Sequence, residues 1–267
     1  MFLTLNGQTI HAATGAVPLA NRSEPLVVLV HGAGMDRTVW SHQTRFLAHH
    51  GFRALAVDLP GHGRSDGPPL TSIEDLALWV AALAEYFDQP LHLVGHSMGA
   101  LIALHAAGHH QESVASLGLL GVAVAMPVHP ELLAAAQDND PKAAALMTSW
   151  GLGSLQHVGE NPTPGLSMVG GVQALIESSP AGVLATDLAT CSVYDQAVMA
   201  AENTQCPVTM FLGSGDKMTP RRAAQPLIDS FVTKPAVNDI ADCGHMMMME
   251  KPNEIRQGLL AHLNQML

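Results

Sequence analysis

The sequence of 267 residues predicts an α/β protein in which helices cover both faces of a mostly parallel sheet of about eight strands. Short apolar runs alternate along the chain with segments whose apolar residues recur at helical spacing. The run Leu26–Val30 is continuously apolar, as in strands buried on both faces. Asn6-Gly7 separates two short β-like segments, which predicts an antiparallel hairpin at the start of the chain.

The predicted elements follow in order along the chain. Helix 73–87 is the clearest, because Thr71 and Ser72 precede it and the acids Glu74 and Asp75 suit the dipole of its first turn. Two further helices are expected at 99–109 and 254–267. The expected strands are residues 2–5, 9–13, 26–30, 54–57, 91–94, 116–120, 208–212 and 236–240.

The alternation stops between residues 124 and 204. This segment contains no convincing strand, and a Gly/Pro-rich stretch at 151–171 interrupts it. Helices are expected there at 130–137, 141–150, 172–176 and 194–201, the second of them opened by Asp140-Pro141. We therefore expect a core formed by residues 1–123 and 205–267, with a helical cap inserted as residues 124–204.

Composition excludes several classes of function. The net charge of −11 leaves no basic footprint, so no nucleic-acid partner is expected. The longest nearly uncharged apolar run, 114–128, is shorter than the roughly 20 residues that span a bilayer, so no membrane span is expected. Three cysteines without C-x-x-C spacing predict neither disulfides nor a metal site, and no cofactor is expected. The opening residues show no signal peptide, which predicts a cytoplasmic protein.

The sharpest motif is Gly95-His96-Ser97-Met98-Gly99, which lies between a predicted strand and a predicted helix. A tight strand-to-helix turn exposes the Ser97 hydroxyl in a strained backbone geometry, and the flanking glycines remove Cβ atoms that would clash. This context is that of a nucleophile elbow. Ser97 is therefore the predicted catalytic nucleophile.

A serine nucleophile needs a base, and the base needs an acid that orients it. Asp216 follows the strand predicted at 208–212, and His245 follows the last predicted strand. The chain order of serine, acid and histidine is the one expected when a nucleophile elbow occurs in this architecture. Asp216 and His245 are therefore the predicted acid and base.

Together these motifs resemble the α/β-hydrolase fold family, in particular its serine esterases and lipases. The resemblance also includes His31-Gly32-Ala33-Gly34 after a strand, the segment from Asp58 to Ser65, and Gly244-His245 followed by Glu250-Lys251-Pro252. It covers nearly the full length except the cap. It implies an α/β-hydrolase fold with a Ser-Asp-His triad and cleavage of carboxylic esters through an acyl-enzyme on Ser97.

The developing negative charge on the substrate carbonyl oxygen needs preorganised donors. The N–H of Met98 at the start of a helix is one candidate, and the resemblance implies Ala33 as the other, with Gly34 second. Gly34, Trp150, Tyr194 and Met246 are candidate substrate contacts.

The cap carries most of the acidic excess. Against one base, Lys142, it has eight acids: Glu131, Asp138, Asp140, Glu160, Glu177, Asp187, Asp195 and Glu202. It has no arginine that could hold a carboxylate or phosphate by paired hydrogen bonds. The expected substrate is therefore a small, neutral or apolar ester.

Other chemistries could use the same three residues. Lactonase, carbon–carbon bond hydrolase, perhydrolase or haloperoxidase, and acyltransferase activities stay open, and a small-molecule receptor on this scaffold is the non-enzymatic alternative. Dehalogenase and epoxide hydrolase activities are disfavoured, because those relatives have Asp where Ser97 stands.

Overall fold

The computed structural model describes residues 1–19 and 24–266 and contains one sheet of eight strands. Their spatial order is β1-β2-β4-β3-β5-β6-β7-β8. The predicted fold class is confirmed, and most strands are one or two residues longer than expected. The strands are β1 (Phe2–Leu5), β2 (Gln8–Ala13), β3 (Leu26–Val30), β4 (Arg53–Val57), β5 (Leu91–His96), β6 (Val114–Leu120), β7 (Val208–Gly213) and β8 (Ala236–Ile240).

The sheet is parallel from β4 to β8, and the hairpin β1–β2 joins it antiparallel at one edge. Positive φ angles at Asn6 (51°) and Gly7 (79°) form the tight turn of this hairpin, as the sequence predicted. All five residues of β3 are buried, which explains why this central strand has no polar face.

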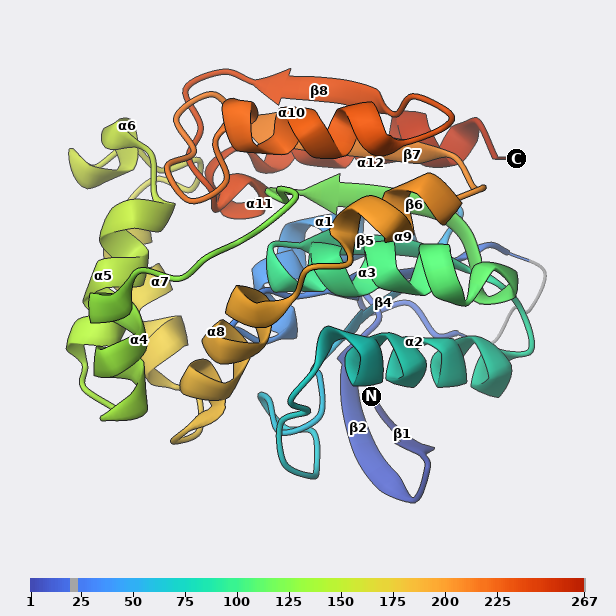
Figure 1. Ribbon diagram of the computed structural model, residues 1–267, viewed down its shortest axis with the longest axis horizontal. Coiled ribbons are helices and arrows are strands. Elements are labelled where there is room, and N and C mark those ends of the chain that lie inside the picture. Colours follow the sequence, from blue (N-terminus) through green and yellow to red (C-terminus); the bar gives the residue numbers. More distant parts are fainter. Residues whose placement is uncertain (20–23, 267) are drawn as a thin grey trace.

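Helices cover both faces of the sheet (Figure 1). On one face α2 (Ile73–Phe87) packs against α3 (Met98–His109), and α3 in turn packs against α9 (Ala197–Asn203). On the other face α1 (Ser41–Ala48) packs against α12 (Pro252–Asn264). The last predicted helix therefore begins two residues early and ends at Asn264; its predicted final residue, Leu267, lies outside the described residues.

Residues 124–204, all of which are described, contain helices and no strand. Five of the helices, α4 to α8, gather at one end of the sheet (Figure 1). We refer to residues 124–204 as the cap. Its helices are α4 (Pro130–Gln137), α5 (Lys142–Gly151), α6 (Ser154–His157), α7 (Met168–Glu177), α8 (Val183–Val193) and α9.

Some helices differ from those that the sequence predicted. The start of the expected helix 194–201 is wrong, because Tyr194 has an extended backbone and the helix there, α9, begins at Ala197. Tyr194 instead follows the end of α8, a helix that was not predicted. Helices α1 and α10 (Arg221–Ser230) were also missed. The reason in α1 and α8 is that polar side chains occupy buried positions, Gln43 and Thr44 in α1 and Asp187 in α8, which hides the apolar periodicity.

No helix within the described residues combines the length and apolar character needed to cross a bilayer.

Candidate active site

Ser97 lies at the turn between β5 and α3 with φ 54° and ψ −116°, a conformation that L-residues rarely adopt. The turn has no room for side chains on either side. A Cβ atom at Gly95 would overlap the carbonyl oxygen of Gly99, and one at Gly99 would overlap that of Val30. The two glycines of the motif are therefore required by close backbone packing, which leaves Ser97 at the top of the sheet.

The imidazole of His245 is held by Asp216. Its Nδ1 lies 2.8 Å from Oδ2 of Asp216, and both side chains are buried. The carboxylate only accepts hydrogen bonds, so Nδ1 carries a proton. In the neutral ring this leaves a lone pair on Nε2, which is buried and has no hydrogen-bond partner among the described residues. Such a nitrogen can accept a proton from a substrate-bound or neighbouring hydroxyl.

Thr219, which was not predicted as a site residue, completes this arrangement. Its hydroxyl donates to Oδ2 of Asp216 at 2.8 Å and lies 3.3 Å from Nδ1 of His245. Its backbone N–H donates to the other carboxylate oxygen at 2.9 Å, and the N–H of Met218 donates there at 2.8 Å. The short spacing from Asp216 to Thr219 was the available signal, since Asp side chains commonly accept from backbone N–H groups two or three residues later.

These contacts keep Asp216 ionised. Burial by itself would raise the pKa of this carboxyl group, but the charge and hydrogen bond of His245, together with the hydrogen bonds from Thr219, outweigh it. The pKa of Asp216 is consequently held well below its usual range. An ionised carboxylate at this position can stabilise a positive charge that forms on His245.

The backbone of His245 is attached to the cap. Its N–H donates to the carbonyl oxygen of Gly151 at 2.7 Å, and its own carbonyl oxygen lies 3.0 Å from Nε2 of His96. Gly121, with φ 60°, lies so close to the imidazole that a Cβ atom there would be 2.9 Å from the ring. His96 therefore supports the loop of His245.

The two expected oxyanion donors lie beside Ser97. Met98 is the first residue of α3, and Ala33 follows β3. No hydrogen bond from either N–H is found within the part of the chain that the structure describes. Gly34, the second choice, differs, because its N–H already donates to Asp187 at 2.8 Å.

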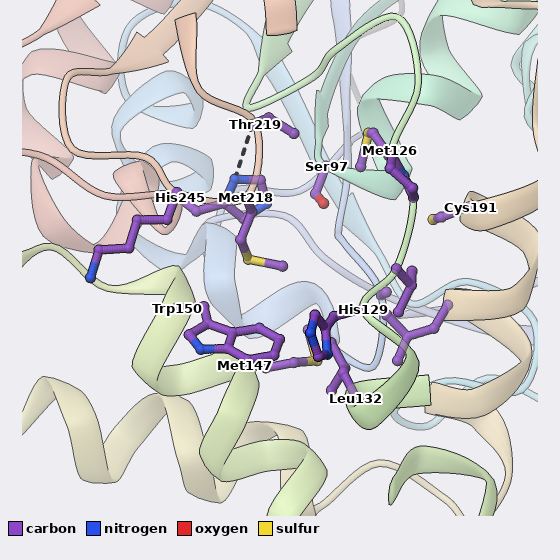
Figure 2. A pocket seen from close by; sticks show the side chains of 15 residues that line it. Ser97, Met126, His129, Leu132, Met147, Trp150, Cys191, Met218, Thr219 and His245 are labelled. Carbon is purple, nitrogen blue, oxygen red and sulfur yellow. Dashed lines mark hydrogen bonds between the residues drawn. The ribbon is translucent and has the colours of Figure 1, made fainter. Parts of the chain in front are cut away.

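Ser97, Thr219 and His245 line one cavity of about 280 Å³ (Figure 2). Ser97 and His245 line one side of it, and the cap residues Trp150, Met147 and Leu132 lie opposite. Most of its wall is apolar. The lining residues are Ala33, Ser97, Met126, Pro127, Val128, His129, Leu132, Met147, Trp150, Leu188, Cys191, Lys217, Met218, Thr219 and His245.

Of the four candidate substrate contacts, only Trp150 lines this cavity. Gly34 is buried beneath the cap with its N–H occupied. Tyr194 is buried in the core, where its hydroxyl lies 3.0 Å from Nδ1 of His105, and Met246 is also buried and does not line the cavity. Gly34, Tyr194 and Met246 are therefore left out of the candidate pocket. Apolar residues of α4, α5 and α8 take their place, and the sequence could not single them out because a core helix and a pocket wall have the same apolar pattern.

The acids of the cap do not reach the cavity. Within the described part of the chain, no Asp or Glu lines the cavity, and Lys217, which is exposed, is the single Lys or Arg side chain that does. Glu131 lies 2.6 Å from Lys142 and Glu160 lies 3.3 Å from Lys251. Seven of the eight cap acids are exposed and only Asp187 is buried, so the acidic excess lies mainly on the outer surface of the cap. Among the described residues, no group of three or more His, Cys, Asp or Glu is placed to hold a metal ion.

Comparison with known proteins identifies the family. The model of the alpha/beta hydrolase family matches residues 27–257. This chain belongs to the alpha/beta hydrolase family. The fold agrees: an enol-lactonase from Burkholderia xenovorans has a TM-score of 0.87 at 18% identity over 99% of this chain and 100% of that one. An esterase from Thermogutta terrifontis has a TM-score of 0.84 at 21% identity over 100% and 98%.

Relatives within this alpha/beta hydrolase family include pimeloyl-[acyl-carrier protein] methyl ester esterases. The enzyme of Aromatoleum aromaticum is 28% identical over 251 residues, which cover 87% of this chain and 95% of that protein. The enzyme of Methylococcus capsulatus is 43% identical over 96 residues, so that match spans only 36% of either protein.

Proposed function

We propose that this alpha/beta hydrolase cleaves neutral or apolar carboxylic esters through an acyl-enzyme on Ser97. One observation carries the proposal. The imidazole of His245 is fixed at Nδ1 by the ionised Asp216, its Nε2 has no hydrogen-bond partner among the described residues, and His245 and the strained Ser97 line the same cavity. This is the arrangement of nucleophile, base and orienting acid that acyl transfer needs.

The reaction follows from these positions. His245 Nε2 takes the proton of Ser97 as Oγ attacks the ester carbonyl carbon, and the resulting oxyanion accepts hydrogen bonds from the N–H groups of Ala33 and Met98. The tetrahedral intermediate collapses, and the imidazolium gives its proton to the departing alkoxide. Water then attacks the acyl-enzyme with His245 again as base, which releases the acid and restores Ser97. Asp216 stays ionised and stabilises the imidazolium in both steps.

The class of reaction is supported by the relatives. Two relatives that match this chain over nearly their whole length are named as ester hydrolases, in agreement with the activity predicted from the sequence. Their carrier-protein esters are substrates of those proteins. For this chain we propose a small-molecule ester, because the cavity is of small-molecule size and lined mainly by apolar side chains.

The cap, residues 124–204, supplies most of the apolar wall and is proposed to select the substrate. Among the residues that the structure describes, the lining includes no arginine that could hold a carboxylate or phosphate by two parallel hydrogen bonds. Lys217 is the exception to a neutral lining, and it is exposed to water. We expect kcat/KM for a monoacid ester to exceed that of its dicarboxylate half-ester analogue by more than about tenfold, since the buried carboxylate would lack a partner. Equal values would contradict the proposed substrate class.

Substitution Ser97→Ala tests the nucleophile. We expect it to abolish nearly all turnover of p-nitrophenyl butyrate and to leave the circular dichroism spectrum and Tm unchanged. Ser192→Ala, which alters an exposed serine of α8, is the matched control and should keep full activity. Turnover by Ser97→Ala at the rate of the parent protein would overturn the proposed function.

We also propose that the protein works in a reducing compartment such as the cytoplasm. Cys191, Cys206 and Cys243 are all free thiols, and burial raises the pKa of each of them, which keeps them protonated. Titration of three thiols in protein purified from cells without added reductant would support this, whereas fewer would count against it.

A further inference from the structure

A buried ion pair joins the cap to the core beside the candidate oxyanion site. Oδ2 of Asp187, on α8, lies 2.8 Å from Nε2 of His62, in the loop after β4, and each side chain is only 1% exposed. The same oxygen accepts the N–H of Gly34 at 2.8 Å. Asp187 thus contacts the residue next to Ala33, whose N–H is a proposed oxyanion donor.

The hydrogen bonds of His62 define its charge. Its Nδ1 lies 3.0 Å from the carbonyl oxygen of Pro60, and its Nε2 faces the carboxylate of Asp187. Both partners can only accept, so both ring nitrogens must donate and the ring is an imidazolium. The positive charge of His62 balances the negative charge of Asp187. The carboxylate can therefore hold Gly34 without placing an uncompensated negative charge beside the developing oxyanion.

One face of α8 serves both the oxyanion loop and the cavity. Leu184 covers Gly34 so closely that a Cβ atom there would lie 2.6 Å from its Cδ1, and Gly34 has φ 66°. Leu188 and Cys191, one and two turns further along, line the cavity. Asp187 lies between these contacts on the same helix. Leu188 and Cys191, which line the substrate cavity, and Asp187, which holds Gly34, therefore belong to the same rigid helix.

We propose that Asp187 is a positioning residue for ester cleavage: from the cap it holds the peptide N–H of Gly34 and thereby orients the neighbouring N–H of Ala33 toward the substrate oxygen. This inference rests on the proposed function. Without the carboxylate, the N–H of Gly34 loses its acceptor and the loop after β3 is free to reorient. The oxyanion donors act in the transition state, so the loss falls on kcat more than on KM.

The test compares Asp187→Ala with Asp187→Asn and with Asp138→Asn, an exposed carboxylate of the cap. Rates on p-nitrophenyl butyrate are divided by the number of sites that a fluorophosphonate labels at completion, so that unfolded protein does not count. We expect kcat per site to fall about 10- to 100-fold in Asp187→Ala, less than the full loss of a donor, with KM within about threefold. Asp187→Asn keeps an oxygen acceptor and should stay within about threefold of the parent protein, as should Asp138→Asn.

A second measurement separates positioning from general damage. An aryl trifluoromethyl ketone forms a tetrahedral adduct with the serine, so its inhibition constant should rise in Asp187→Ala by the same factor by which kcat/KM falls. The double variant His62→Leu with Asp187→Leu removes both buried charges and avoids an unpaired one, which protects folding if Asp187→Ala unfolds. It still lacks an acceptor for Gly34, so the same loss of kcat is expected.

A kcat per site within twofold of the parent protein in Asp187→Ala or in the double variant would overturn the inference, and so would a loss confined to KM. Either result, combined with an inactive Ser97→Ala, would leave the proposed function intact. Activity retained by Ser97→Ala would instead overturn the proposed function itself.

Discussion

Glu250 accepts a hydrogen bond of 2.9 Å from the N–H of Gly244, the residue directly before His245. The same carboxylate oxygen accepts the N–H of Gly153 in the cap at 3.0 Å. Glu250 is 1% exposed, and burial raises its pKa although the backbone N–H groups around it act in the opposite direction. The Glu250 side chain therefore bonds the loop of His245 to the cap, in a buried environment that disfavours the ionised carboxylate.

Glu250→Ala should lower both stability and activity. The substitution leaves the buried N–H groups of Gly153 and Gly244 without an acceptor, which should lower the free energy of unfolding by about 2 kcal/mol or more. Glu250→Gln keeps an oxygen acceptor and removes the buried charge, so its stability at pH 7 should equal or exceed that of the parent protein. Thermal unfolding and kcat of the two variants check this. An unchanged Tm in Glu250→Ala would show that the two hydrogen bonds do not hold the loop.

Asp216→Asn should lower kcat by about 10³- to 10⁴-fold while the fold is retained, because an amide does not fix the imidazole in the form whose Nε2 can accept a proton. The measurement is kcat with p-nitrophenyl butyrate beside a near-ultraviolet circular dichroism spectrum. Asp239→Asn is the matched control, since Asp239 is exposed, pairs with Arg221 and does not line the cavity. A loss of less than tenfold in Asp216→Asn would rule out this carboxylate as the orienting acid.

His262 should make the protein less stable in acid. Its ring bonds Thr209 at 2.9 Å and Ser116 at 3.0 Å, and burial, assisted by His92, lowers its pKa to about 4. In the unfolded chain this histidine binds a proton near pH 6.5. The stability that it contributes by staying neutral in the folded protein is therefore complete above that pH and is lost as the pH falls toward 4. A histidine with this shift lowers the free energy of unfolding by about 2 kcal/mol between pH 7 and pH 5.

Urea unfolding at the two pH values measures this difference. His262→Gln should show a smaller loss of unfolding free energy than the parent protein between pH 7 and pH 5. The exposed His49, changed to Gln, should leave that loss unaltered. An identical loss in His262→Gln and the parent protein would contradict the assignment.

Met147→Ala should shift the acyl-chain preference toward longer esters. Met147 lines the cavity from α5, and its removal opens space opposite Ser97. Each methylene that becomes buried contributes about 0.8 kcal/mol, so kcat/KM for the octanoate relative to the butyrate should rise about fourfold or more. Met199→Ala, on the exposed side of α9, is the control. A ratio that does not change would place the acyl chain elsewhere in the cavity.

Local patterns in the sequence were sufficient to predict the strands and to propose a nucleophile, an acid and a base. Continuous apolar runs predict buried parallel strands, and the glycines around Ser97 are dictated by backbone contacts that no other residue allows. Helices α1 and α8 could not be predicted in the same way, since their buried faces contain Gln43, Thr44 and Asp187. Gln43 and Asp187 are satisfied by distant segments, through the carbonyl oxygen of Met248 and the imidazole of His62, whereas Thr44 bonds the carbonyl oxygen of Trp40 one turn earlier.

The sequence by itself determined the fold class and the identity of Ser97, Asp216 and His245 as candidates, because each follows a strand end and strand ends meet at one edge of a parallel sheet. Tertiary structure alone decided which apolar residues face the cavity, since pocket walls and core share one pattern. It also decided the meaning of Asp187, one of eight cap acids in the sequence. Its partner His62 is 125 residues away along the chain, and only folding brings the two charges together.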